Sequence, residues 1–358
     1  MAPTRTEILQ SASPHPDFTK VPTYPNCPNR LPESLFQAAA ENAQAPPPAN
    51  ITIPTLRTAS NAGKAQHRSS HVAPPAGLRE WEIEIPTRDG NTIPALVYGP
   101  TNEAVSERPI LLFFHGGGWC IGNRFDDFQA NRAIAEENDI IVVSVEYRLA
   151  PEHPFPTTVY DGLDELQWVA VNAHKIHKSG SPSKGLIVGG VSAGGNIANA
   201  VVHLNCKQSS TAPVTGQFLS VPPLLPAHLV PEMYKDDFIS NEQNKDTMVP
   251  PPKLLEMFIG AYNPHSNSPL FSPFSPSAGY QGLPPTYIQA CGVDVLRDDA
   301  LIYERVLREE HQIATRVDLY SGLPHHFWEF FPQLTEAVEK RTKDTVAGIT
   351  WLLVKGDM

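Results

Sequence analysis

The chain has 358 residues with 27 basic and 38 acidic side chains, which gives a formal net charge of −11 at neutral pH. This acidic balance argues against a nucleic-acid partner and against an anionic membrane surface, because both carry negative charge. No apolar run approaches the ~18 residues that a membrane span requires. The four cysteines show neither paired spacing nor ligand spacing, and the first residues lack the apolar core of a secretory signal. We therefore expect a cytoplasmic protein without a disulfide framework or a zinc site.

Residues 1–80 are rich in proline and poor in regular apolar periodicity, which predicts an arm and not an independent domain. Residues 32–45 are the one stretch of this arm with a helical pattern, and extended or irregular chain is expected around them. Apolar side chains such as Leu35, Ile53 and Leu56 would be exposed to water if the arm did not pack. We expect it to pack on the rest of the molecule; a partly disordered leader is the alternative.

From residue 81 the chain alternates between strand-like and helix-like segments. Residues 81–85 and 92–97 flank the turn pair Asp89-Gly90, which predicts a β-hairpin. Short and nearly all-apolar runs, typical of strands buried on both faces, follow at residues 110–114, 140–145, 186–188 and 287–290. Helical patterns separate or follow them at residues 126–137, 158–174, 195–205, 298–310 and 334–353. The alternation predicts an α/β domain whose mainly parallel sheet has helices on both faces and the hairpin at its edge.

Residues 222–275 interrupt this alternation with proline-rich chain and short helical patterns near 231–238 and 252–262. A long stretch without sheet strands inside a compact domain is usually functional, often as a lid. We therefore expect a cap above the strand ends, built from this insertion and the arm. The chain is accordingly divided into the arm (1–80), a first core part (81–221), the cap insertion (222–275) and a second core part (276–358).

A candidate nucleophile lies in the segment Gly190-Val191-Ser192-Ala193-Gly194, which matches the pattern G-x-S-x-G. The segment follows a predicted strand and precedes a predicted helix, which is the context that a nucleophile elbow requires. Such a turn holds the serine in a strained conformation, and side chains at the two flanking glycine positions would clash with the neighbouring strand and helix. Ser192 is therefore the candidate nucleophile.

A second motif, His-Gly-Gly-Gly-Trp at residues 115–119, follows the predicted strand 110–114. Consecutive glycines leave backbone N–H groups accessible at a strand end, where they can stabilise a developing oxyanion. A phosphate loop would instead need GxxxxGK[ST], or GxGxxG before a helix, and neither is present. His115 precedes the glycines, so we expect it to brace the loop and not to transfer protons.

A nucleophilic serine needs a base, and the base needs a carboxylate that orients it. In the order serine, acid, histidine, the acid follows a late strand and the histidine follows one further strand. Asp294 comes after the strand at 287–290, whereas the acidic pair at 298–299 opens a helix, where such residues are common. His325 and His326 follow a last predicted strand at 315–320, and either of them fits the base.

Five motifs occur together in one order: HGGGW at 115–119, EYRLAPEHPFP at 146–156, GVSAGGN at 190–196, GVDVLRDD at 292–299 and GLPHHFW at 322–328. With them the chain resembles the hormone-sensitive-lipase-like esterases, a group of α/β-hydrolases similar to arylacetamide deacetylases and bacterial family IV esterases. The resemblance covers roughly residues 110–328 and implies an α/β-hydrolase fold with an eight-stranded, mainly parallel sheet. The arm and the insertion match the family's cap in position only.

Carried across by position, the resemblance implies that Ser192 is the nucleophile, Asp294 the acid and His325 the base. The implied oxyanion donors are the backbone N–H groups of Gly117, Gly118 and Ala193. Three positions depart from the family: Val191 replaces an acidic residue or threonine, Val295 replaces a proline, and His326 replaces a glycine. None of these changes removes a reacting group. We expect the substrate pocket to include Gly116, Trp119, His326 and Trp328.

The implied activity is hydrolysis of a small to medium apolar ester through an acyl-enzyme, and this chemistry needs no metal or organic cofactor. Two other functions stay open. The first is a non-hydrolytic cyclase or lyase of a biosynthetic pathway that uses the same pocket. The second is a ligand-binding receptor, as in the gibberellin receptors of plants, which lack the catalytic histidine that His325 supplies here. The expected partner is a small-molecule ester, and the sequence allows a homodimer without selecting it.

Overall fold

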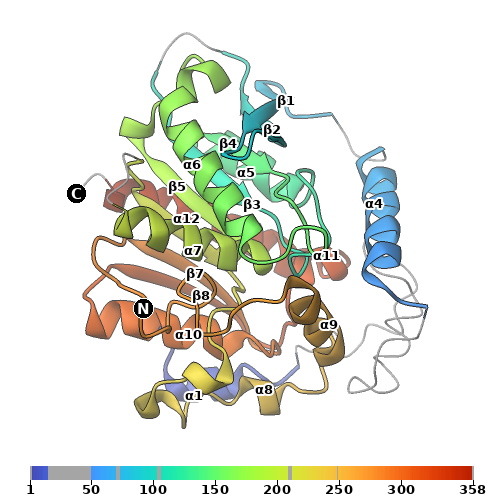
Figure 1. Cartoon of the computed structure of the whole chain (residues 1–358), viewed down its shortest axis with the longest axis vertical. Helices are drawn as coiled ribbons and strands as arrows, with labels where there is room; N and C mark the ends of the chain where they lie inside the picture. The colour runs from blue at the N-terminus through green and yellow to red at the C-terminus, as the bar shows by residue number, and fades with distance from the viewer. Residues whose placement is uncertain are drawn as a thin grey trace.

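The computed structural model describes residues 2–14, 50–69, 73–102, 106–208, 212–247 and 249–356. One eight-stranded sheet has the order β1-β2-β4-β3-β5-β6-β7-β8. β1 pairs antiparallel with β2, and β2 pairs antiparallel with β4, whereas every other neighbouring pair is parallel. The predicted sheet with its antiparallel hairpin at one edge is therefore confirmed (Figure 1).

The strands are β1 (Leu78–Pro86), β2 (Thr92–Pro100), β3 (Ile110–Phe114), β4 (Ile141–Val145), β5 (Leu186–Val191), β6 (Gly216–Ser220), β7 (Thr286–Cys291) and β8 (Thr315–Tyr320). Their register aligns the carboxyl ends of the parallel strands. Phe114 at the end of β3 pairs with Val145 and Gly190, and Cys291 at the end of β7 pairs with Tyr320. The loops that follow these strands therefore begin at one edge of the sheet, where ligands bind in open α/β folds.

Strand β6 has no counterpart among the individually predicted strands. It lies fully buried between β5 and β7. Its five residues, Gly-Gln-Phe-Leu-Ser, contain only two large apolar side chains and stand between Pro213 and Pro222. The surrounding prolines made the whole segment resemble loop, although the strand is stabilised by pairing on both sides.

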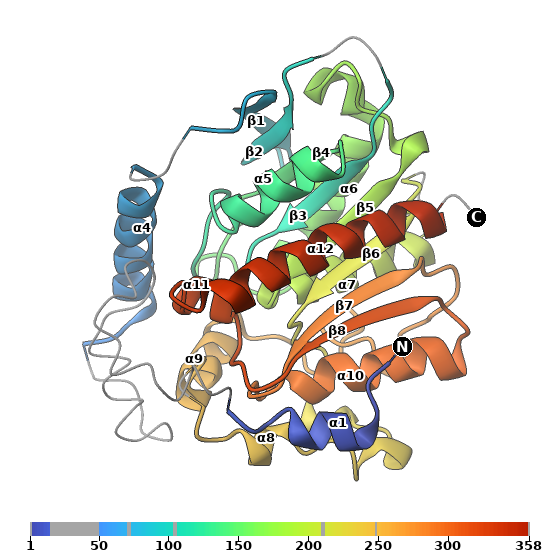
Figure 2. The same ribbon diagram turned by 180° about the vertical axis from the view of Figure 1, so that it is seen from behind.

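Helices cover both faces of the sheet. On one face lie α6 (Thr157–Ile176), α7 (Ala193–Lys207) and α10 (Arg297–Arg305), as Figure 1 shows. On the other face lie α5 (Phe128–Glu137) and α12 (Thr335–Gly356), which are in front in Figure 2. Each layer packs on its own cluster of buried apolar side chains. Short turns of helix complete the core: η1 (Pro182–Lys184), the π-helical turn η4 (Val306–Glu310) and α11 (Phe327–Phe330).

The described part of the arm contains two helices where the sequence predicted irregular chain, namely α1 (Arg5–Gln10) and α4 (Ile53–Ser69). The helix expected at 32–45 lies outside the described residues. Gly63 weakens the helical pattern of α4 and its buried stripe is narrow, so its periodicity is easily missed; Pro54 lies in the first turn, where proline is tolerated. Ile53 and Leu56 are nonetheless buried in the main core cluster, which explains why the helix forms.

The chain between β6 and β7 leaves the sheet and forms η2 (Ala227–Leu229), η3 (Glu232–Tyr234), α8 (Ser240–Gln243) and α9 (Pro252–Tyr262). Two buried carboxylates at the start of α10 bind the backbone of this segment between β6 and β7. Asp298 accepts the backbone N–H groups of Ile239 and Ser240 at 2.7 and 2.6 Å. Asp299 accepts those of Leu224 and Leu225 at 2.9 and 2.8 Å. Both residues lie in the first turn of α10, as the sequence predicts, and they also bind the insertion, a role that the sequence did not indicate.

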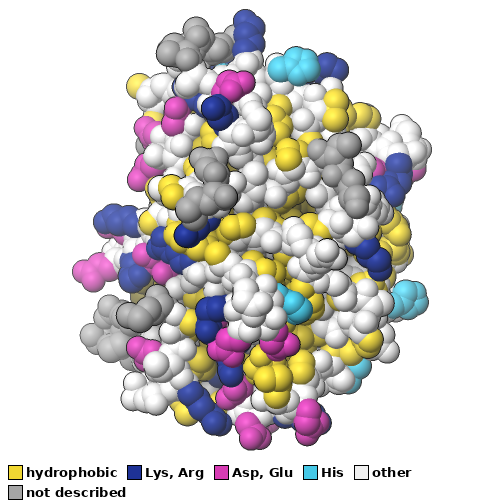
Figure 3. Space-filling model, turned by 90° about the vertical axis from the view of Figure 1, so that its left-hand side faces the viewer, with side chains coloured by type: hydrophobic (Ala, Val, Ile, Leu, Met, Phe, Trp, Pro, Cys, Tyr) yellow, Lys and Arg dark blue, Asp and Glu magenta, His cyan; other side chains and the backbone are white. Residues whose placement is uncertain are grey.

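Charged residues of both signs are interspersed on the face turned away from α4 (Figure 3). The net charge of −11 is therefore not gathered into one acidic patch on that face. Among the helices that the structure describes, none combines the length and apolar character that crossing a membrane requires.

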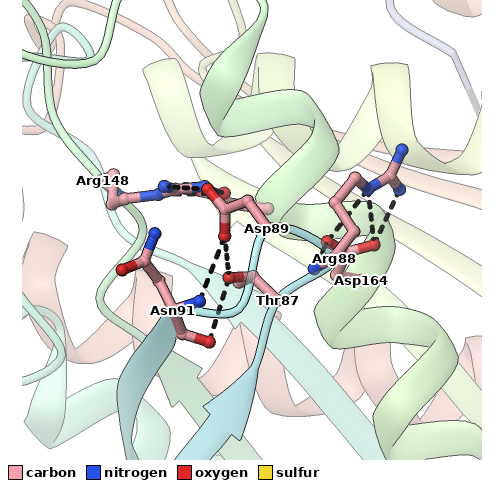
Figure 4. Close-up of polar contacts among 7 residues, drawn as sticks. Thr87, Arg88, Asp89, Asn91, Arg148 and Asp164 are labelled. Atoms are coloured by element: carbon pink, nitrogen blue, oxygen red, sulfur yellow. Dashed lines mark hydrogen bonds and ion pairs between the residues drawn. The ribbon is translucent and has the colours of Figure 1, made fainter.

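Ion pairs fix the turn of the β1–β2 hairpin to the core (Figure 4). Arg148, from the EYRLAPE motif, pairs with Asp89 at 2.6 Å, and Arg88 pairs with Asp164 of α6 at 2.7 Å. Hydrogen bonds from the Thr87 hydroxyl and from Arg148 hold the pKa of Asp89 well below its usual range. Arg148 of this motif thus attaches the hairpin to the core.

Candidate active site

Ser192 lies in a tight turn between β5 and α7. Its backbone adopts φ 54° and ψ −121°, a strained conformation for a residue with a side chain. A Cβ atom at Gly190 would approach Gly194 to 2.4 Å, and one at Gly194 would approach the Phe114 carbonyl oxygen to 2.1 Å. Both positions therefore require glycine, for the steric reason that the sequence pattern indicates.

His325 lies between Ser192 and Asp294 and bonds to both. Its Nε2 atom is 2.9 Å from the Ser192 hydroxyl oxygen, and its Nδ1 atom is 2.6 Å from Asp294 Oδ2. The other carboxylate oxygen, Oδ1, accepts the backbone N–H of Leu296 at 2.9 Å. An Nδ1–H group donated to the carboxylate leaves Nε2 free to accept the serine proton. The loops after β5, β7 and β8 thus bring together a Ser-His-Asp relay, and the geometry selects His325 over its neighbour.

The glycine loop, residues 115–118, faces this relay. Gly117 and Gly118 line the same cavity as the serine and have φ angles of 122° and 58°. A Cβ atom at Gly117 would lie 2.1 Å from the Ile121 carbonyl oxygen, and one at Gly118 would lie 2.3 Å from the Phe258 ring. Ala193 is the first residue of α7, where backbone N–H groups have no acceptor within the helix. All three expected oxyanion donors therefore lie at this edge of the sheet.

His115 braces the glycine loop. Its ring is fully buried, and Nδ1 lies 2.7 Å from the Gly116 carbonyl oxygen. The ring stacks on Tyr147 at 4.2 Å, and the Tyr147 hydroxyl donates to the His115 carbonyl oxygen at 2.9 Å. A Cβ atom at Gly122 would collide with the imidazole at 2.2 Å, so the loop closes tightly around it. This geometry fits the bracing role expected for His115.

A cavity of about 70 Å³ opens beside Ser192 and His325. Most of its wall is apolar and comes from Ile121, Val249, Leu254, Phe258, Leu296 and Phe330. Helix α4 of the arm adds Ser60 and Lys64, and helix α9 of the insertion adds part of the apolar wall. Parts of the chain separated by about 200 residues therefore meet over the reacting groups.

Of the four expected pocket residues, Gly116 and His326 line the cavity, whereas the two tryptophans do not. Trp119 is fully buried and stacks on Tyr262 with ring centroids 4.7 Å apart. The Trp328 indole N–H donates to Asp127 Oδ1 at 3.0 Å. The expectation for both tryptophans is corrected, because Trp119 packs on Tyr262 in the core and Trp328 bonds to Asp127, and neither lines the cavity.

His326 occupies a left-handed backbone position, with φ 54° and ψ 33°. Its imidazole Nε2 lies 3.4 Å from Asp127 Oδ1, so an aspartate that the sequence analysis passed over holds it. Asp127 was placed inside a predicted helix, but α5 begins one residue later and Asp127 itself has φ 53°. The sequence signal for Asp127 is that it forms an acidic pair with Asp126, only a few residues after the glycine loop.

Asp127, His326 and Glu329 place one possible ligand atom each within 4.8 Å of one another. A metal ion prefers such carboxylate and imidazole groups. Here, however, Asp127 Oδ1 already accepts the Trp328 N–H and contacts the His326 ring. Hydrogen bonds within the protein thus account for this grouping.

Lys64 of α4 forms an ion pair with Asp126 at the cavity wall. The Nζ atom lies 2.7 Å from Asp126 Oδ2, and the two side chains are 9% and 1% exposed. The same carboxylate oxygen is 3.9 Å from His115 Nδ1. No sequence pattern points to this pair, because the two residues are 62 positions apart and belong to no motif.

Known proteins share this architecture. The family model for the α/β-hydrolase fold matches residues 111–329. An AB hydrolase superfamily protein of Schizosaccharomyces pombe is 33% identical over 305 residues, which cover 85% of this chain and 89% of that protein. Versiconal hemiacetal acetate esterase of Dothistroma septosporum is 33% identical over 248 residues, 68% of this chain and 74% of the esterase.

A solved structure adds to these sequence relatives. The crystal structure of vibralactone cyclase has a TM-score of 0.76 and 30% identity, and it covers 98% of this chain and 97% of its own. The matched family model spans more than half of the chain and contains the serine, the aspartate and the histidine. The chain therefore belongs to the hormone-sensitive-lipase-like esterases of the α/β-hydrolase fold, and it is a carboxylic ester hydrolase.

Proposed function

We propose that the chain hydrolyses small to medium apolar esters with a short acyl group, through an acyl-enzyme formed on Ser192. The observation that carries this proposal is the position of His325, within hydrogen-bonding distance of both Ser192 and Asp294. A receptor that only binds its ligand would have no need of this relay. The same observation therefore disfavours the reading of the chain as a receptor.

In the proposed mechanism, His325 takes the proton of Ser192 while the serine oxygen attacks the ester carbonyl carbon. The N–H groups of Gly117, Gly118 and Ala193 stabilise the resulting oxyanion, and one such donor is worth about 2.7–4 kcal/mol of barrier. The alcohol leaves with the proton from the imidazolium, and a water molecule then attacks the acyl-enzyme with His325 again as base. Asp294 holds the imidazole tautomer and stabilises its positive charge.

The size and polarity of the cavity support a short acyl group. About 70 Å³ is available beside the serine, and most of the surrounding side chains are apolar. A pocket of this character favours small apolar groups and excludes long chains unless its walls move. One relative, at 33% identity, is named as the esterase of an acetate ester, which agrees with this size.

We also infer that the arm (1–80) and the insertion (222–275) act together as the cap of the core formed by 81–221 and 276–358. Support comes from the cavity wall, to which α4 of the arm and α9 of the insertion both contribute. Specificity would then depend on residues that belong to none of the five motifs.

A cyclase is the second candidate, and the similarity to vibralactone cyclase over 98% of this chain favours it. On this reading, a nucleophile within the substrate, in place of water, closes a ring at the activated carbonyl. The same pocket would then have to fold the substrate back upon itself.

A panel of p-nitrophenyl esters with acyl chains of two to eight carbons, assayed with Ser192→Ala, tests the proposal. We expect the shortest chains to react fastest and the variant to lose at least about 10³-fold in kcat. Ser277→Ala, at an exposed position, serves as the matched control. Turnover that survives in Ser192→Ala would contradict the acyl-enzyme.

A further inference from the structure

We infer that Lys64 is a positioning residue for this reaction: helix α4 brings its ammonium group to Asp126 and so neutralises a buried carboxylate beside the oxyanion site. This inference rests on the proposed ester hydrolysis and extends it, because it makes the docked arm helix part of the active site. The arm then contributes to the chemical step as well as to the cavity wall.

Helix α4 is held firmly against the loops around the cavity. Arg57 donates to the carbonyl oxygens of Cys120 and Ala150 at 2.9 and 2.7 Å, and it pairs with Glu152 at 2.9 Å. Lys64 lies seven residues after Arg57, two helical turns further along the same face. The anchored helix therefore determines where the ammonium group lies.

The ion pair lies on the wall of the cavity in which the oxyanion would form. Lys64, Asp126, Gly117 and Gly118 all line this cavity, whose volume is about 70 Å³. Asp126 is only 1% exposed, so water does not screen its negative charge effectively. Without a compensating cation, this carboxylate would repel the negative charge that develops on the substrate oxygen in the transition state.

The histidine next to the pair does not supply that cation. His115 lies 3.9 Å from the Asp126 oxygen, but its ring is fully buried in the brace of the glycine loop. Burial lowers the pKa of His115, and the nearby ammonium of Lys64 lowers it further, although Asp126 opposes both effects. His115 is thus neutral at neutral pH, and the compensating charge comes from Lys64.

The test is a double-mutant cycle that removes the two charges, with steady-state kinetics on the best p-nitrophenyl ester. Lys64→Met should lower kcat roughly ten- to one-hundred-fold, because the unpaired charge of Asp126, partly screened by its surroundings, would repel the oxyanion. KM should change much less. Lys64→Arg should restore most of the rate. The double variant Lys64→Met/Asp126→Asn should turn over at least about ten times faster than Lys64→Met, because it removes the unpaired carboxylate.

Lys253→Met is the matched control, since it removes a lysine from an exposed ion pair with Glu256, outside the cavity wall, and leaves the charge of Asp126 paired. If kcat falls in this variant, adding Asp126→Asn should not restore it. An unchanged kcat in Lys64→Met, or a double variant as slow as the single one, would overturn the inference. If Lys64→Met does not fold, Lys64→Gln replaces it, with the same expected loss and the same rescue.

Failure of this inference is distinguishable from failure of the proposed function. A wild-type chain that hydrolyses none of the esters contradicts the proposed function. In that case the variants are compared by the rate at which a fluorophosphonate labels Ser192. This reaction also places negative charge on an oxygen in the oxyanion site. Equal labelling rates for wild type and Lys64→Met would overturn the inference by itself.

Discussion

At the scale of single residues, His326 shows how this chain departs from its family beside the base. A left-handed backbone, with φ 54°, favours glycine, yet a histidine occupies the position. Its ring contacts Trp328 at 4.6 Å and Asp127 at 3.4 Å, and these contacts offset the conformational cost. Because the imidazole also lines the cavity, it reduces the space for an acyl group.

Replacing His326 by glycine should widen the cavity without straining the backbone. We expect the ratio of kcat/KM for butyrate over acetate esters to rise roughly 10-fold, since each methylene in an apolar pocket is worth about 1–3 kcal/mol. Kinetics on p-nitrophenyl esters measure this ratio. His228→Gly, at an exposed position outside the cavity wall, is the control. An unchanged ratio in the glycine variant would show that His326 does not limit the acyl group.

His203 makes the stability of the fold dependent on pH. Burial lowers its pKa to about 4, and its ring bonds to the Tyr303 hydroxyl and the Gly279 carbonyl oxygen at 2.9 Å each. The unfolded chain therefore binds the proton more readily than the folded one. The free energy of unfolding should fall as the pH drops from about 6.5, the usual histidine pKa, towards 4.

Urea unfolding of His203→Gln between pH 4 and 7 checks this expectation. The variant should have a lower free energy of unfolding at neutral pH. That free energy should also change less steeply with pH, because unfolding of the variant takes up as much as one proton fewer than unfolding of the wild type. The exposed His228, changed to Gln, is the control. An identical slope in His203→Gln and wild type would assign the acid sensitivity to other groups.

At the scale of elements, α1 joins the two loops that carry Asp294 and His325. The Ser11 carbonyl oxygen, at the end of α1, accepts the Gly322 N–H from the loop of the base at 2.6 Å. The same oxygen would lie 1.9 Å from a Cβ atom at Gly292, in the loop of the acid. The first described residues of the arm therefore help to set the distance between acid and base.

Gly292→Ala should displace Ser11 and disturb this arrangement. We expect kcat to fall roughly 100-fold, because a shift of about 1 Å in a catalytic group has such an effect. The melting temperature should fall as well, since overpacking costs about 1–3 kcal/mol. Gly279→Ala is the matched control, because its Cβ atom would meet nothing within 4 Å. Wild-type kinetics in Gly292→Ala would contradict the role of α1.

At the scale of the whole molecule, the sheet gathers residues that are far apart in the chain. Ser192 and His325 are 133 positions apart, and Lys64 and Asp126 are 62 apart, yet all four line one cavity. Parallel pairing puts the loops after neighbouring strands at one edge and so brings Ser192 and His325 together, whereas Lys64 reaches the cavity on helix α4 of the arm. The cytoplasmic location and a homodimer stay predictions of the sequence.

The serine, the acid and the base could be predicted because their motifs are local. The serine and the acid follow strands whose apolar runs are visible in the chain, the base follows the less apolar strand at 315–320, and the turn chemistry of Gly190 and Gly194 depends only on nearby backbone. Strand β6 and helix α4 escaped prediction because tertiary pairing and packing stabilise them more than their own patterns do. The two tryptophans were misplaced because adjacency in sequence does not reveal which way a ring points.

The amino-acid sequence by itself determined most of the order of strands and helices, the elbow around Ser192, the acid Asp294 and a pair of candidate histidines for the base. Short-range sterics and hydrophobic periodicity suffice for these features. Only the tertiary structure decided which side chains close the cavity, which histidine faces the serine, and that Lys64 meets Asp126. Such contacts depend on how the arm and the insertion pack on the core. This packing requires surfaces formed by residues far apart in the chain, so no local sequence pattern predicts it.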